Sequence, residues 1–307
     1  MAWQDTWFSL SFDRPSTIPI SQPVIPYQLN SRPGGRTYFE TKCRIISLTI
    51  EIVRERMFGG YLQVKISTIV DYLERIQQIL RDSQPYLRFP DCCRTLTQRL
   101  QRAFLTMQAS YISAELSRST LHSNVSPAQH HLLVLQQECV ANLIQTVKSY
   151  IEIHSIDARA SRAWIAFQRC VSCAFLLAVT KCSRSDPVVK LLLQKLEVIL
   201  TEHATEDVFS DQPEPAGFKS ATALNGTLSA LRKLITIRTQ YFTSQGSHGT
   251  DNNQGRIGTT LLDKSPSAEP SLGSSPATLS DDLSASVSQH IQPSLWAWNV
   301  GDYETAF

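Results

Sequence analysis

Apolar residues recur at helical spacing through most of this sequence, and this periodicity restricts the fold more than any other feature. From Trp164 to Ala178 the apolar side chains fall on one face of a helix. No segment shows the convincing alternation of apolar and polar residues that is typical of a half-buried strand. The body of the chain is therefore predicted to be all-α. Helices are expected over about 45–53, 66–80, 94–116, 127–151, 164–178, 187–200 and 220–241.

Local signals mark several ends of these helices. Ser126-Pro127 and Asp186-Pro187 each place a capping residue before a proline in the first turn, and Pro85 marks a stop. The expected helices differ in length and show no repeat of fixed period. With 42% hydrophobic residues the chain can bury a sizeable core. We expect an irregular multi-helix bundle with short loops.

The composition changes after residue 243. Residues 244–307 contain seven acidic and two basic side chains, which gives this segment a charge of −5. Because the whole chain has a net charge of +2, residues 1–243 carry a charge of +7. Residues 244–294 are rich in Ser, Gly, Thr and Pro and cannot bury enough apolar surface to offset their chain entropy. We predict a helical domain over 1–243 and a disordered acidic tail over 244–307.

Charge and hydropathy exclude several classes of protein. A net charge of +2 excludes a protein that coats nucleic acid by charge alone. No apolar run approaches the roughly 18 residues that span a bilayer, and the sequence after Met1 does not resemble a signal peptide. The chain has seven cysteines, an odd number. They are spread over segments with apolar helical periodicity and do not form the dense framework of a disulfide-rich protein. The chain is expected to be soluble and intracellular, without a membrane partner.

The cysteines do not predict a metal site. The one Cys-x-x-Cys pattern, Cys170 to Cys173, lies inside an apolar helical segment, whereas zinc ligands usually converge from loops or turns. The adjacent pair Cys92-Cys93 follows Pro90 in a loop and lacks further ligands nearby. We expect buried thiols at Cys170 and Cys173 and no metal or other cofactor in this chain.

No catalytic constellation is predicted either. His130 and His131 are neighbours and face different directions on a helix, while His154 and Asp157 are expected to be solvated or to cap a helix end. Neither a phosphate-binding glycine loop nor a Gly-x-Ser-x-Gly turn occurs. We therefore expect a protein that is not an enzyme. A solvated helix face, in preference to a nucleic-acid site, is expected for Arg88, Arg94, Arg99 and Arg102.

The first residues look like the inside of a helix. Trp3, Trp7 and Leu10 share one helical face, and Met1 precedes them without a cap or lead-in. The turn Asp13-Arg14-Pro15 ends this segment. Two interpretations are possible: a domain truncated at its N-terminus, or a short helix that begins at Met1.

Three segments of the sequence are similar to a known family. The run from Trp3 to Pro15, a tryptophan-containing helix that ends in Asp-Arg-Pro, resembles the regulatory domain of fungal zinc binuclear-cluster transcription factors. The segment from Ser161 to Arg169 resembles a late helix of that domain, and Leu224 to Leu234 is more weakly similar to its closing helix. The residues that carry the resemblance are Trp3, Asp5, Asp13, Arg14, Pro15, Trp164 and Gln168.

The resemblance implies a nuclear regulator of transcription. Such factors bind DNA through six cysteines that hold two zinc ions, and this sequence contains no such cluster. Zinc and specific DNA binding are therefore expected only from a missing N-terminal module, or DNA binding from a partner. The expected partners of the chain itself are the transcription machinery or co-regulators.

The end of the chain combines aromatic and acidic residues in a way that suits either of two roles. After the long polar segment, such a composition is typical of an acidic-hydrophobic activation segment. The alternative is a latch that folds back onto the helical body. Both fit the residues, and the family resemblance favours activation. The segment comprises Trp296, Trp298, Asp302, Tyr303, Glu304 and Phe307.

An alternative function belongs to another class. A helical bundle with aromatic-lined gaps suits a non-enzymatic sensor of an apolar small molecule, or a scaffold without a transcriptional role. Trp164, Phe167 and Phe175 are the pocket residues that this alternative predicts, although such residues more often pack in a core.

Overall fold

The described part of the chain is helical. The computed structural model describes residues 9–10, 31–58, 65–122, 130–180, 186–209, 226–233 and 235–236. Within these ranges the structure contains helices and turns but no strand, and the only bridge joins Arg36 and Ser83. The predicted all-α fold is confirmed. None of the described helices is long and apolar enough to cross a membrane.

The chain divides into two compact units, Met1–His203 and Ala204–Phe307. The second unit has helical residues at 226–233, within the helix predicted over 220–241. The domain boundary predicted at residue 243 lies outside the described residues and stays a prediction. The labelled helices are α2 (Tyr38–Phe58), α3 (Ile66–Arg81), α4 (Pro85–Arg88), α5 (Leu96–Ser117), α6 (His130–Ile156), α7 (Ala158–Ser161), α8 (Trp164–Val179) and α9 (Pro187–Phe209), with 3-10 turns at Pro90–Cys92 and Arg118–His122.

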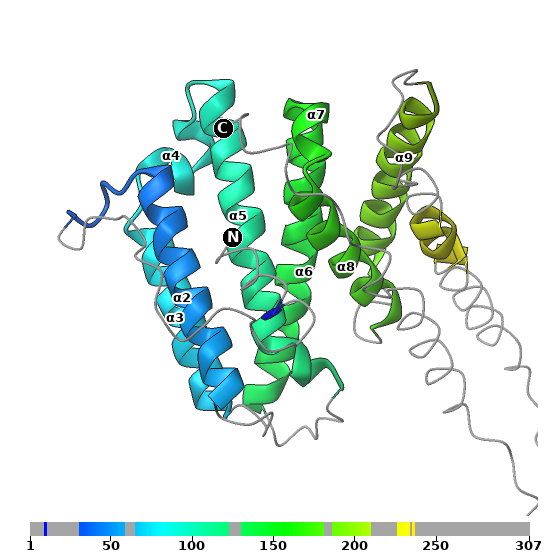
Figure 1. The fold of residues 1–307 in the computed structure, drawn as a ribbon. Coiled ribbons are helices and arrows are strands. Elements are labelled where there is room, and N and C mark those ends of the chain that lie inside the picture. Colours follow the sequence, from blue (N-terminus) through cyan, green and yellow to red (C-terminus); the bar gives the residue numbers. More distant parts are fainter. Residues whose placement is uncertain are drawn as a thin grey trace, which may run out of the picture. The chain divides into compact units, whose positions relative to one another are not determined.

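Helix α5 is the central element of the first unit. It contacts α2, α3 and α4 as well as α6 and α8, and Figure 1 shows α5 and α6 running side by side. Nearly every α5 side chain from Ala103 to Ser117 is buried, including polar ones. A helix that is covered on all sides in this way organises the helices around it.

The core fills the interfaces of α5, α6 and α8. Tyr111 and Ile112 of α5 are almost fully buried, as are Leu143 and Tyr150 of α6. Burial of one such side chain stabilises the fold by about 1.5–3 kcal/mol. Helix α8 contributes small buried residues, which permit a close approach to α6: Ala166, Cys170, Cys173, Ala174 and Ala178.

Side-chain caps fix the starts of α5 and α9. The Thr95 hydroxyl accepts the Gln98 N–H at 3.1 Å, so α5 begins at Leu96, close to the predicted position. Asp186 accepts the Val188 N–H at 2.8 Å, which confirms the predicted start of α9. The start predicted at Ser126-Pro127 lies outside the described residues.

The segment before α2 is joined to the end of α3. Gly34 has a φ of 81°, and its N–H donates to the Asp82 carbonyl at 2.8 Å. The Arg36 guanidinium contacts the Asp82 carboxylate at 2.8 Å, and both side chains are largely buried. Positive φ favours glycine, so the turn depends on Gly34.

Little of the predicted N-terminal helix is described. Ser9 and Leu10 are helical, and Leu10 is completely buried, as expected for the apolar face. The family-signature residues Trp3, Asp5, Asp13, Arg14 and Pro15 lie outside the described residues. The predicted tail over 244–307 does so too.

Candidate functional site

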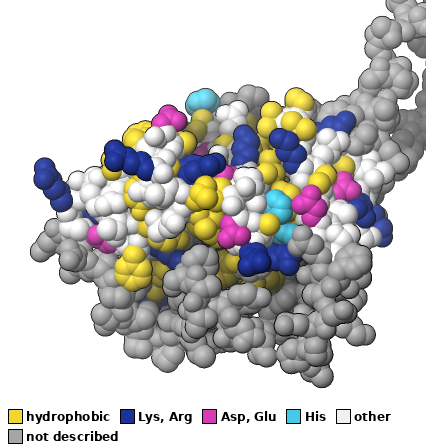
Figure 2. Space-filling model, turned by 90° about the horizontal axis from the view of Figure 1, so that it is seen from above, with side chains coloured by type: hydrophobic (Ala, Val, Ile, Leu, Met, Phe, Trp, Pro, Cys, Tyr) yellow, Lys and Arg dark blue, Asp and Glu magenta, His cyan; other side chains and the backbone are white. Residues whose placement is uncertain are grey.

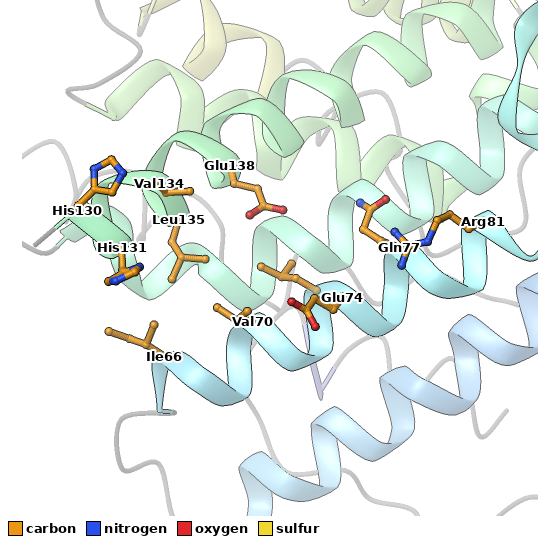
Figure 3. Close-up of a pocket in the computed structure, with 11 residues that line it drawn as sticks. Ile66, Val70, Glu74, Gln77, Arg81, His130, His131, Val134, Leu135 and Glu138 are labelled. Atoms are coloured by element: carbon orange, nitrogen blue, oxygen red, sulfur yellow. The ribbon is translucent and has the colours of Figure 1, made fainter.

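A groove of about 570 Å³ lies between α3 and the first turns of α6. Both helices also contact α5. Figure 3 shows side chains from the two helices facing the space between them. The lining residues are Ile66, Val70, Leu73, Glu74, Gln77 and Arg81 of α3, and His130, His131, Val134, Leu135 and Glu138 of α6.

The part of the groove lined by the first turns of α3 and α6 is apolar and partly open to solvent. Ile66 and Val70 of α3 are 41% and 38% exposed, and Val134 of α6 is 45% exposed. Leu73 and Leu135 are buried in the same groove. Single exposed apolar residues are ordinary on a protein surface, whereas exposed apolar residues that share one groove make it a candidate binding surface.

Two carboxylates lie beside these apolar side chains in the groove. Glu74 of α3 and Glu138 of α6 line the groove from opposite helices, and neither has a hydrogen-bond or ion-pair partner among the described residues (Figure 3). Arg81 lies toward one end, where its guanidinium donates to the Gln78 side chain at 2.8 Å. His130 and His131 form the other end, with ring centroids 6.4 Å apart.

The sequence places these residues together through helical periodicity. On α3, positions 66, 70, 74, 77 and 81 form one stripe, beside a second stripe whose Ile69, Leu73 and Ile76 are buried. The groove was not predicted from the sequence, because the apolar residues of 66–80 were used only to predict the helix. The width of the apolar surface, wider than one core stripe, is the signal that was available.

A second polar cluster joins α6, α7 and α9. His154 Nδ1 lies 3.1 Å from Ser161 Oγ, and His154 Nε2 lies 3.2 Å from the Glu202 carboxylate. His203 Nε2 lies 3.2 Å from the same Ser161 hydroxyl. The expected capping role of Asp157 is confirmed, because it accepts the Arg159 N–H at 2.9 Å and caps α7. His154, expected to be solvated or capping, instead contacts Ser161 and Glu202. The sequence pattern did not link these two residues to it.

The order Glu202, His154, Ser161 has the residue types of a hydrolytic triad, but its geometry does not suit one. The Ser161 hydroxyl donates to the Ala158 carbonyl at 2.7 Å, so its proton is directed away from His154. Ser161 is also completely buried. Burial, with His154 and Arg162 nearby, lowers the pKa of His203 to about 4. This cluster suits a structural link between helices.

The cysteines of α8 are core residues. Cys170 and Cys173 are fully buried inside the helix, and burial raises the pKa of both thiols well above their usual value. Cys92 is exposed and Cys93 partly exposed in the turn after α4. Within the described ranges no three His, Cys, Asp or Glu side chains are grouped as a metal site would require.

The four arginines of 88–102 differ in their surroundings. Arg88, Arg94 and Arg99 are exposed, whereas Arg102 pairs with Glu152 of α6. The face in Figure 2 shows Lys and Arg side chains scattered among acidic and apolar ones. This distribution agrees with a solvated surface.

The remaining predicted site residues lie apart from the groove. Trp164 begins α8 and is half-buried, Gln168 is buried one turn later, and Phe175 is in the core. Neither these residues nor the half-buried Phe167 line the groove. The predicted activation segment, 296–307, lies outside the described residues.

Function has to be inferred from these residues and their geometry. No protein-family model, curated protein or solved structure matches this chain.

Proposed function

We propose that this chain is a regulator of transcription of the fungal binuclear-cluster type, or its regulatory half. Its helical body acts by binding a protein partner. The observation that carries the proposal is the groove between α3 and α6, where Ile66, Val70 and Val134 remain exposed above a buried floor. An apolar centre with a polar rim is the usual make-up of a protein interface.

Two further features support this function. The sequence from Trp3 to Pro15 resembles the regulatory domain of that family, and the all-α body agrees with the resemblance. The low net charge of +2, with Lys and Arg side chains mixed among acidic and apolar ones on the face in Figure 2, argues against direct DNA binding by this chain. DNA recognition, and any zinc, would come from a missing N-terminal module or from a partner, and the protein would act in the nucleus.

The C-terminal segment would recruit the transcription machinery or co-regulators. Its aromatic residues Trp296, Trp298, Tyr303 and Phe307 would enter a partner groove, and Asp302 and Glu304 would keep them soluble until then. The function needs no catalysis. Of the polar clusters described above, only the Ser161 cluster has catalytic residue types, and its serine is buried.

A reporter assay with the whole chain fused to a heterologous DNA-binding domain tests the proposal. We expect activation, and we expect the double substitution Trp296→Ser and Trp298→Ser to remove most of it. Phe39→Ser, a substitution of an exposed aromatic residue on α2, is the control and should leave activation unchanged. A fusion that is expressed and nuclear but inactive would refute the transcriptional function.

The volume of the groove favours one second candidate. About 570 Å³ falls within the range of small-molecule pockets. A non-enzymatic sensor or scaffold without a transcriptional role would therefore use the same groove. That candidate predicts a silent reporter together with a shift in thermal stability by an apolar small molecule.

A further inference from the structure

We infer that the groove between α3 and α6 binds a basic amphipathic helix of a partner protein. This inference rests on the proposed function for the existence of a partner, and it names the chemistry of that partner from the groove itself. Three properties of the groove carry it: its two helical walls, its exposed apolar side chains above a buried floor, and its two carboxylates.

The shape of the groove suits a helix. The α3 wall follows one stripe along the whole of a 16-residue helix, which at 1.5 Å per residue is about 24 Å long. The α6 wall follows two turns, from His130 to Glu138. Helices that lie in such grooves use anchors at positions i, i+3 or i+4, and i+7, which matches a floor of separate apolar side chains.

The charges of the groove select a basic helix. An apolar occupant would cover Glu74 and Glu138 and remove water from two carboxylates that have no partner in the described part of the chain. Covering an unpaired charge is costly unless the occupant brings an opposite charge. Lys or Arg side chains beside the apolar stripe of an incoming helix would pair with both carboxylates. Arg81 is near one end and donates to Gln78, so it does not neutralise the centre.

Other occupants fit less well. An acidic amphipathic segment would bring carboxylates against Glu74 and Glu138. In a second copy of this chain, the same groove would present the same two carboxylates at a symmetric interface. The local charge also contrasts with the +7 charge of residues 1–243, so a basic partner is drawn to this groove and not to the surface in general.

Fluorescence anisotropy on the purified full chain tests the inference. The probe is a labelled 16-residue synthetic helix with leucines along one face and lysines on both sides of that face. We expect saturable binding that weakens as salt increases. The double substitution Glu74→Lys and Glu138→Lys should weaken binding about tenfold or more, and Glu74→Gln with Glu138→Gln should weaken it to a smaller extent.

Asp71→Lys is the matched control. Asp71 lies on α3, is well exposed and does not line the groove, so its replacement makes the same change of charge on a neighbouring face. Equal weakening by Asp71→Lys and Glu74→Lys would mean general attraction to the surface and would overturn the inference. Circular dichroism of each variant identifies any loss of folding.

Two other results would also overturn it. One is tighter binding of an acidic peptide with the sequence of residues 294–307 than of the basic probe. The other is a dimer, seen by sedimentation, that Glu74→Lys dissociates and that excludes the probe. The reporter assay separates this inference from the proposed function. Probe binding with a silent reporter refutes only transcriptional activity, and activation without probe binding refutes only the basic-helix partner.

Discussion

The imidazole rings of His154 and His203, from helices α6 and α9, lie with their centroids 5.3 Å apart, and both contact the Ser161 hydroxyl. Ser161 Oγ is 3.1 Å from one ring and 3.2 Å from the other. The hydroxyl gives its single proton to the Ala158 carbonyl, so both rings donate to its lone pairs. Burial, with His154 and Arg162 nearby, lowers the pKa of His203 and favours its neutral form. The shared Ser161 hydroxyl links α6, α7 and α9 at one point.

Acid is expected to destabilise the fold through His203. Its pKa is about 4 in the folded state and near 6.5 when unfolded. The unfolded chain therefore binds more protons between these values, and stability is full above about pH 7, falls as the pH drops toward 4, and changes no further below that. Urea unfolding should give a free energy about 1–2 kcal/mol lower at pH 5 than at pH 7 from this group.

Replacement of His203 provides the control for this prediction. His203→Gln keeps an N–H donor for Ser161 but cannot titrate, so the part of the acid loss due to this residue should disappear. His130→Gln, at an exposed position on α6, should retain the full loss. The charged groups that lower the His203 pKa are His154 and Arg162, and Glu202 pairs with His154; all three are unchanged in both variants. Identical pH profiles for the two variants would contradict the assignment.

Local patterns predicted the helices well. The segment predicted over 164–178 is α8, Trp164–Val179, and the segment predicted over 66–80 is α3, Ile66–Arg81. These outcomes follow because periodicity and capping act over a few residues, as at Asp186. Such signals depend little on the rest of the fold.

Features that depend on packing between distant segments were not predicted. The serines and glutamine of α5 look like a solvent face, yet Gln108 and Ser113 are buried because other helices surround α5 from Ala103 to Ser117. Within the helix, Ser117 satisfies its own hydroxyl by donating to the Ser113 carbonyl at 2.7 Å. The groove likewise depends on how α3 and α6 flank α5, and the histidine cluster joins residues 42 positions apart.

Truncation of a buried leucine on α6 should be costly. Leu143 is completely buried, and Leu143→Ala is expected to lower the free energy of unfolding by about 2–5 kcal/mol through lost burial and the cavity left behind. Val134→Ala, on the exposed part of the same helix, should change it by less than about 0.5 kcal/mol. Chemical denaturation of both variants checks this, and similar losses would mean that α6 is not oriented as described.

The turn before α2 should require glycine at one position only. Gly34 has a positive φ with open space around it, so Gly34→Ala introduces backbone strain without a clash and should cost about 1 kcal/mol. At Gly35 an added methyl group would meet only the Arg32 carbonyl at an ordinary 3.6 Å. Gly35→Ala should therefore be nearly neutral in thermal unfolding. Equal destabilisation by both substitutions would show that the turn has another conformation.

Thiol labelling should distinguish buried cysteines from metal ligands. With an aromatic disulfide reagent on the native protein, Cys92 should react rapidly because it is exposed, and Cys92→Ser should remove that rapid phase. Cys170 and Cys173 should react only after denaturation, because burial keeps both thiols protonated and inaccessible. A strong zinc chelator should leave their protection and the melting temperature unchanged, since packing and not a bound ion protects them. Rapid labelling of either thiol after chelation would instead identify them as zinc ligands and refute their assignment to the core.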